Sequence, residues 1–252
     1  MERYFTGKTV LVTGAGWGVG AATALLYASY GAKVVIADTS VKGGKNLAAK
    51  IKRQNGESSF IRTDVNSPSD CEKLIKRTIE TYGSIDIACN NSAICTKRAH
   101  SLYKDMNLLG NEMSIDLNSL FYCMKYEIEA MQKKGGGVII NLAFVLGANG
   151  LASYDPFVAV KYGMNEPTQN IPAEFSVGGI RVNAVTPTFI NTALRQEMRL
   201  TKKGTLVKLP AMGRIAKMEK VASVVVWLSS DKAPFTLRGD QFKVVDWSYD
   251  QN

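Results

Sequence analysis

The sequence predicts an α/β fold built on one parallel sheet of about seven strands, with helices on both faces. Strand-like and helix-like segments alternate from one end of the 252-residue chain to the other. The strand-like runs are short and apolar, as expected for strands that are buried on both sides of a sheet. No linker rich in Pro or Ser and no repeat divides the chain, so we expect residues 1–252 to form a single domain.

The expected elements follow one another in a regular order. Runs rich in Val, Ile and other strand-forming residues predict strands at residues 9–12, 33–37, 58–62, 85–89, 137–141, 180–185 and 241–245. Helices are expected over residues 18–30, 42–53, 69–82, 113–133 and 221–229, with a further one near Pro156. This order is typical of a doubly wound sheet.

Composition and charge exclude several classes of function. The formal net charge is +9, but Lys and Arg are spread along helix-like segments, which favours a solvated surface over a nucleic-acid site. No apolar run reaches the roughly 18–20 residues of a membrane span, and no secretion signal is expected, which points to the cytoplasm. The four cysteines show no metal-ligand spacing and His100 is the only histidine, so no metal site is expected.

The first predicted strand runs into a glycine-rich turn that opens a helix. Such a turn lets backbone amides approach a pyrophosphate, and the helix N-terminus then faces its negative charge. The strand before it, the helix after it and an acidic residue at the end of the second strand make a dinucleotide site the favoured interpretation. The residues expected to hold the cofactor here are Gly14, Gly16, Trp17, Gly18, Val19 and Gly20.

Asp38, at the end of the second strand, indicates which dinucleotide is bound. Its carboxylate can accept hydrogen bonds from the adenosine ribose hydroxyls and would repel a 2′-phosphate. No Arg or Lys stands among Ala15, Trp17 and Thr39, where a 2′-phosphate would need one. We therefore predict NAD rather than NADP.

The spacing Thr-Gly-x-x-x-Gly-x-Gly at residues 13–20 resembles the signature of the short-chain dehydrogenase/reductase family, a family with a Rossmann-type fold. Further motifs continue the resemblance in order along nearly the whole chain. Those at residues 124–127 and 210–214 look most like the bacterial glucose-dehydrogenase-like branch. The resemblance implies that further residues contact the cofactor or support it, namely Asp64, Val65, Asn91, Pro187, Ile190 and Thr192.

The same resemblance implies a catalytic site that this chain has altered. The family uses a tyrosine as general acid/base, a lysine four residues later, a serine after the fifth strand and a helix-four asparagine. Lys161 matches the lysine and Asn118 the asparagine, but Phe157 stands at the tyrosine position and Phe144 at the serine position. A phenyl ring neither donates nor accepts a proton, so ordinary carbonyl reduction is expected to be weak.

Two residues upstream of Lys161 are candidate substitutes for the missing acid. Tyr154 lies seven residues before Lys161, about two helical turns, and Asp155 is its neighbour. The alternative is that they are loop and N-cap residues, which is favoured. Two phenylalanines facing one pocket predict an apolar pocket for a small-molecule substrate or ligand.

Two prolines, Pro167 and Pro172, fall inside the helix expected to carry Lys161. A proline in a helix interior removes a hydrogen bond and clashes with the preceding turn, so this helix is expected to kink or stop near Pro167. The resemblance implies that this helix also contributes to the family's subunit interface. A homo-oligomer is therefore compatible with the sequence, but the usual tetramer is not expected. Residues 192–213 resemble a substrate lid.

Three classes of function follow from these observations. The first is an NAD-dependent oxidoreductase of the short-chain family whose hydride chemistry is weak or reassigned. The second is a non-redox role on the same fold, such as an isomerase, a cyclase or an NAD-binding sensor. The third is an interaction protein with a vestigial site. The substrate is not predicted by any motif.

Overall fold

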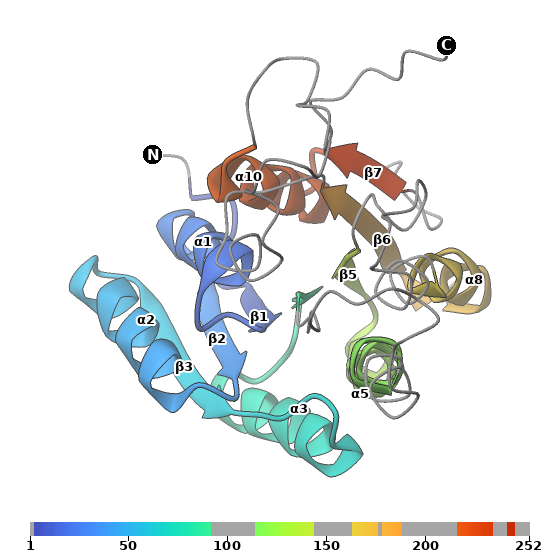
Figure 1. Ribbon diagram of the computed structural model, residues 1–252, viewed down its shortest axis with the longest axis horizontal. Coiled ribbons are helices and arrows are strands. Elements are labelled where there is room, and N and C mark those ends of the chain that lie inside the picture. The colour runs from blue at the N-terminus through green and yellow to red at the C-terminus, as the bar shows by residue number, and fades with distance from the viewer. Residues whose placement is uncertain are drawn as a thin grey trace, which may run out of the picture.

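The computed structural model describes residues 3–91, 114–143, 163–175, 178–187, 216–233 and 241–244. Within them, seven strands pair in parallel in one sheet of order β3-β2-β1-β4-β5-β6-β7 (Figure 1). This confirms the predicted α/β fold with its parallel sheet. The strands are β1 (Thr9–Thr13), β2 (Lys33–Asp38), β3 (Glu57–Arg62), β4 (Ile87–Asn90), β5 (Gly137–Leu142), β6 (Ile180–Pro187) and β7 (Gln241–Val244).

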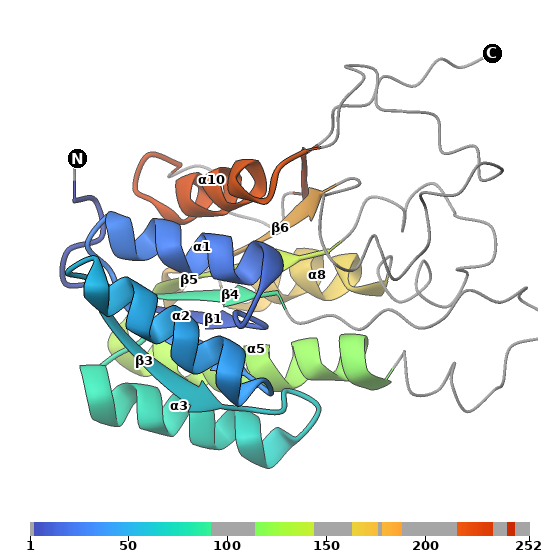
Figure 2. The same cartoon turned by 60° about the vertical axis from the view of Figure 1, so that its left-hand side comes forward.

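Helices cover both faces of the sheet, as Figure 2 shows. The helices α1 (Gly18–Ser29), α2 (Val41–Arg53) and α10 (Met218–Ser229) contribute to one hydrophobic core. The helices α3 (Pro68–Tyr82), α5 (Ser119–Lys134) and α8 (Asn165–Phe175) contribute to the other. The layers are therefore helix, sheet and helix, as in a doubly wound fold.

The central strands are apolar throughout because successive side chains enter different cores. In β1, Val10 and Val12 pack into the core under α1, whereas Leu11 packs into the core above α3 and α5. In β2, Val34 packs into the core under α1 and Val35 into the core of α3 and α5. A strand buried on both faces needs no polar alternation, since side chains point to opposite faces in turn.

Local signals fix the helix ends. The Ser40 hydroxyl accepts a hydrogen bond from Gly43 N–H at the start of α2, and Ser67 accepts one from Asp70 N–H at the start of α3. The C-cap residues of α3 and α5 are Gly83 and Gly135, with φ of 86° and 93°. These left-handed conformations favour glycine.

The structure adds detail to two expectations about helices. The helix expected over residues 113–133 begins with a wide π-type turn, Ser114–Asn118, before α5 proper. The kink or stop expected near Pro167 corresponds to an interruption three residues earlier, at Met164, which separates helical Gly163 from α8. A turn at Met164 precedes α8, which then continues through both prolines to Phe175. Pro167 stands in the first turn of α8, where its missing N–H removes no helical hydrogen bond.

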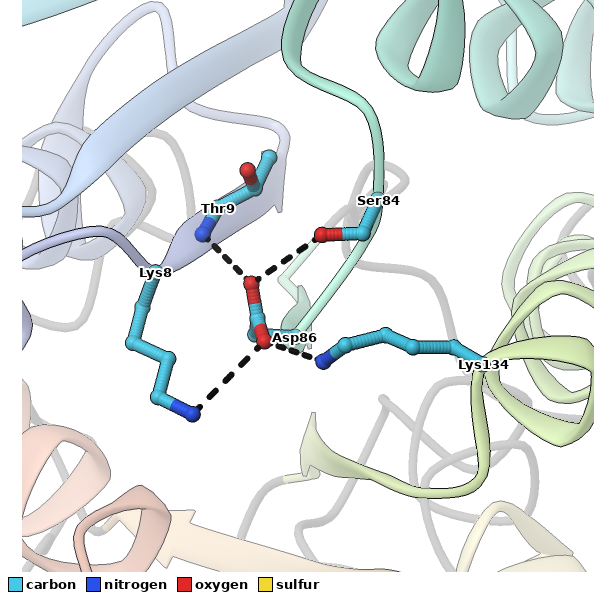
Figure 3. Close-up of polar contacts among 5 residues, drawn as sticks. All are labelled: Lys8, Thr9, Ser84, Asp86 and Lys134. Atoms are coloured by element: carbon cyan, nitrogen blue, oxygen red, sulfur yellow. Dashed lines mark hydrogen bonds and ion pairs between the residues drawn. The ribbon is translucent and has the colours of Figure 1, made fainter.

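At the amino edge of the sheet, Asp86 joins β1, β4 and α5 (Figure 3). Its carboxylate accepts a 2.8 Å hydrogen bond from Thr9 N–H and contacts the ammonium groups of Lys134 and, at 3.8 Å, Lys8. Burial raises the pKa of Asp86, but the Lys134 and Thr9 hydrogen bonds and the two positive charges outweigh it, so the pKa is lowered. The ionised carboxylate thus links the starts of β1 and β4 to the end of α5, at the edge of the sheet opposite the glycine loop.

In the part of the chain that the structure describes, no helix is both long and apolar enough to cross a membrane.

Candidate functional site

The glycine loop lies where the strand order of the sheet reverses. β1 pairs with β2 on one side and with β4 on the other, so the chain first winds outward to β3 and then crosses back to β4. In open parallel sheets, ligands bind outside the carboxyl ends of the strands at such a reversal. The glycine loop follows β1 and therefore lies where such folds bind their ligands.

The backbone of the loop requires glycine at particular positions. Gly14 and Gly18 adopt φ of 58° and 63°, which other residues rarely adopt. A Cβ at Gly20 would lie 2.4 Å from the Gly14 carbonyl oxygen and 2.6 Å from Asn91 Nδ2. Close packing between loop and helix is thus possible only without a side chain at position 20.

Asp38 closes one side of the loop. Its two carboxylate oxygens accept hydrogen bonds of 2.7 Å each, one from Gly16 N–H and one from Ser40 N–H. A Cβ at Gly16 would lie 2.9 Å from the same carboxylate. Asp38 is 7% exposed, so its charge stands beside the loop and not in bulk solvent.

Asn91, which directly follows β4, holds the other side of the loop. Its backbone N–H donates to Thr13 Oγ1 at 3.2 Å, and its side-chain Nδ2 donates to the Gly14 carbonyl at 2.9 Å. Thr13 ends β1, so Asn91 ties the carboxyl ends of β1 and β4 together. The predicted support role of Asn91 corresponds to these contacts.

The start of α1 fits the binding of an anion. Trp17 occupies the N-cap position and has no side-chain oxygen to accept from the first-turn N–H groups. The indole ring is 48% exposed. The N–H groups of the first turn, including those of Gly18 and Val19, therefore have no capping side chain, and an incoming phosphate could accept from them.

The segment after β3 places its two predicted residues differently. Asp64 is exposed, and its Oδ1 accepts from Asn66 N–H at 3.0 Å. Val65 is buried and packs against Cys71 and Cys123. Pro187, predicted to contact or support the cofactor, is the last residue of β6 and pairs with Val244.

A buried polar network lies beneath the carboxyl edge, and sequence reasoning missed it. Asn90 Nδ2 donates to Glu127 Oε2 and to Asn141 Oδ1, at 3.0 Å each, and Asn141 Nδ2 donates to Thr168 Oγ1 at 2.9 Å. Burial raises the pKa of the Glu127 carboxyl to about 7, although the Asn90 hydrogen bond opposes this. An available signal was the position of Glu127 on the apolar stripe that Cys123, Met124 and Met131 form on α5.

The predicted helix-four asparagine, Asn118, is exposed at the end of the π-type turn. Asp116, two residues earlier, is buried and lines a small cavity of about 10 Å³ with Thr13 and Asn90. That volume holds about one water molecule. The structure thus brings Asp116 close to the ends of β1 and β4.

The remaining predicted residues lie outside the described residues. They are Phe144, Tyr154, Asp155, Phe157, Lys161, Ile190 and Thr192, together with the whole lid-like segment 192–213.

The parallel sheet with helices on both faces and a glycine loop at the strand-order reversal, held by Asp38 and Asn91, defines an α/β protein with a Rossmann-type fold. A family model described as enoyl-(acyl carrier protein) reductase matches residues 14–244. The chain belongs to the short-chain dehydrogenase/reductase family, and this confirms the resemblance at the level of the family.

Several relatives match over nearly their full length. Cyclohexanol dehydrogenase of Acinetobacter sp. (strain SE19) is 33% identical over 249 residues, which cover 99% of this chain and 97% of that protein. Cis-4-hydroxycyclohexanecarboxylate dehydrogenase of Sinomonas cyclohexanicum is 32% identical over 94% of this chain and 95% of its own length. Among solved structures, levodione reductase superposes with a TM-score of 0.90 at 27% identity, over 96% of this chain and 97% of that chain.

Proposed function

We propose that this protein is an NAD(H)-binding oxidoreductase that acts on a small cyclic alcohol or ketone, with weakened proton transfer. The observation that carries the proposal is the pair of hydrogen bonds by which Asp38 joins the glycine loop to the start of α2. This places a buried negative charge at the end of β2, where the adenosine ribose of a dinucleotide lies in such folds.

The described residues fit a dinucleotide. The absence of a Cβ at Gly16 and Gly20 leaves the loop backbone close to Asp38 and Asn91, and the uncapped start of α1 offers N–H groups to a pyrophosphate. Gly14, Gly16 and Gly18 would hold the pyrophosphate, and Asp38 the ribose. When bound, the nicotinamide supplies hydride transfer, and the protein supplies position and charge.

NAD is favoured over NADP by the charge of Asp38. A 2′-phosphate would meet a carboxylate whose two oxygens are already fixed by backbone amides, so the side chain cannot turn away without breaking both hydrogen bonds. The neighbouring Thr39 offers no positive charge in compensation.

The class of substrate is inferred from the relatives. Two of them are named for the oxidation of ring alcohols, and both match this chain almost end to end. An apolar pocket bounded by Phe144 and Phe157 would suit an alicyclic ring. The glucose-dehydrogenase-like branch suggested by residues 124–127 remains a prediction.

The loss of proton transfer is the part of the proposal that departs from the family. Phe157 and Phe144 replace the expected tyrosine and serine, whereas Lys161 is retained. Removing one proton-transfer group lowers a rate by about 10²–10⁴-fold. The relatives reported above are dehydrogenases and a reductase, which favours residual redox chemistry over an isomerase, cyclase or sensor role.

Calorimetric titration with NADH and NADPH tests the cofactor. We expect NADH to bind more tightly than NADPH, and equal or reversed affinities would refute the argument from Asp38. A steady-state assay with NAD and cyclohexanol, and with NADH and cyclohexanone, tests the chemistry. Turnover that is detectable but slow supports the proposal, whereas tight NADH binding with no turnover on a broad panel of ring alcohols and ketones favours a sensor.

A further inference from the structure

Two buried cysteines from different helices touch each other. Cys71 lies in the first turns of α3 and Cys123 in the first turns of α5, 52 positions apart in the sequence. Their Sγ atoms are 3.9 Å apart, and the side chains are 1% and 4% exposed. No disulfide joins them, since both are free thiols.

The surroundings of this pair separate it from the main cores. Cys71 and Cys123 form a small apolar cluster of their own with Val65, against which Tyr122 and Tyr126 pack. Cys71 Sγ donates a hydrogen bond of 3.4 Å to the Val65 carbonyl oxygen. Val65 and Cys123 also line the cavity of about 10 Å³ beside Asp116, so there is a small unfilled space next to Cys123.

We propose that Cys71 and Cys123 are a thiol–disulfide site, at which a small diazene oxidant forms a crosslink between α3 and α5. A disulfide has an S–S distance of about 2.05 Å, so each sulfur must move by about 1 Å from its present position. The two thiols lose two protons and two electrons, one S–S bond forms, and the diazene takes up both protons and electrons to become a hydrazine.

The environment makes this reaction slow rather than impossible. The hydrogen bond with Cys71, burial and the nearby Glu127 carboxyl all raise the pKa of Cys123, which reduces its reactive thiolate form. Oxidation should therefore be faster in alkaline solution, and faster in a protein whose α3–α5 packing opens transiently.

The crosslink would have a measurable effect on stability. Bridging residues that are 52 positions apart restricts the unfolded chain more than the folded one, in which the sulfurs already touch. We expect the melting temperature of the oxidised protein to rise by about 5–10 °C for a chain of this size.

The test uses the full chain, oxidised with diamide at about pH 8.5, near the ordinary pKa of a cysteine thiol. Peptide mapping by mass spectrometry without reduction should give one linked pair containing Cys71 and Cys123, two hydrogens lighter than the separate peptides. Reduction should separate the pair and reverse the rise in melting temperature.

Three variants serve as controls. Cys71→Ala and Cys123→Ala should each abolish both the linked peptide and the melting shift. Cys89→Ala removes another buried thiol, in β4, and should leave both intact. If Cys71 and Cys123 are recovered unlinked after exhaustive oxidation, or are linked only to other cysteines or between chains, the proposal fails. None of these readouts involves NAD, so their failure would leave the proposed function untouched.

Discussion

Asn90 donates a 3.0 Å hydrogen bond to Glu127, whose carboxyl group is completely buried between β4 and α5. The other oxygen of Glu127, Oε1, has no hydrogen-bond partner among the described residues. A buried carboxyl with one such oxygen favours its protonated form, because burial disfavours charge.

Glu127 should therefore make stability depend on pH in the direction opposite to most carboxylates. The folded protein holds this proton to about pH 7, whereas the ordinary value for an unfolded chain is 4.5. The group's stabilising contribution is complete below pH 4.5 and is lost as pH rises through 7. In Glu127→Gln this dependence should disappear, as measured by denaturant unfolding at a series of pH values.

The matched control for Glu127 is Glu129→Gln, an exposed position on the same helix that pairs with Lys133. The free energy of unfolding of Glu129→Gln should differ from that of wild type by a small and nearly constant amount between pH 4.5 and 7. If the difference in free energy of unfolding between Glu127→Gln and wild type is also independent of pH, the Glu127 carboxyl is ionised throughout this range.

Gly20→Ala should reduce both stability and NADH affinity. The added Cβ would lie 2.4 Å from the Gly14 carbonyl, which is backbone and cannot rotate away. We expect a loss of about 1–3 kcal/mol in the free energy of unfolding, measured by urea denaturation. Gly178→Ala is the control, because a Cβ there meets nothing within 4 Å and should have little effect. Equal effects of the two changes would contradict the argument from close packing.

Asp38→Ala should weaken NADH more than NADPH. It removes the charge that we expect to face the ribose, at a loss of about tenfold or more in NADH affinity, which corresponds to one hydrogen bond to a charged group. Asp38 also holds Gly16, so Asp38→Asn is the second variant; it keeps the shape and an acceptor but removes the charge. Calorimetry with both cofactors measures the change, and a parallel loss for both in the Asn variant would mean that Asp38 acts only on the loop.

Restoring the family's proton-transfer groups should raise activity. Phe157→Tyr restores the family's tyrosine four residues before Lys161, whose charge we expect to stabilise the phenolate, and Phe144→Ser restores the family's serine, which we expect to orient the substrate oxygen. We expect the double variant to exceed either single variant, with a gain of about 10²–10⁴-fold over wild type in steady-state turnover of ring alcohols. Wild-type rates of about 1–10³ per second would instead mean that another acid is present. Tyr154→Phe and Asp155→Asn would then identify it.

Asp86→Asn should destabilise the protein at neutral pH by about 1–3 kcal/mol, because Lys134 and Lys8 lose their shared carboxylate. The lowered pKa of Asp86 means that its contribution is present above pH 3.8 and is lost as pH falls through the folded value. The difference from wild type should therefore shrink in acid, as followed by thermal unfolding. Asp231→Asn, at an exposed position nearby, is the control.

The sequence by itself determined the features that depend on local chemistry. The alternation of apolar strands and amphipathic helices predicted the parallel sheet, and every described strand lies within two residues of its expected bounds. The loop at residues 14–20 was predictable because positive φ values and a tight strand-to-helix turn require glycine at fixed spacings. Asp38 was predictable because an acidic residue at the end of the second strand accompanies such a loop in dinucleotide sites.

Only the tertiary structure decided what depends on partners far apart in the chain. Asn90, Glu127, Asn141 and Thr168 form one network across four elements, and Cys71 meets Cys123 across two helices. The sequence alone does not distinguish a buried polar residue from a surface one, because the hydrogen-bond partners that allow its burial come from distant segments. The effect of Pro167 on α8 likewise depends on where that helix begins, which the structure decides. The burial of Asp116 and the exposure of Asn118 depend on the π-type turn that contains both residues.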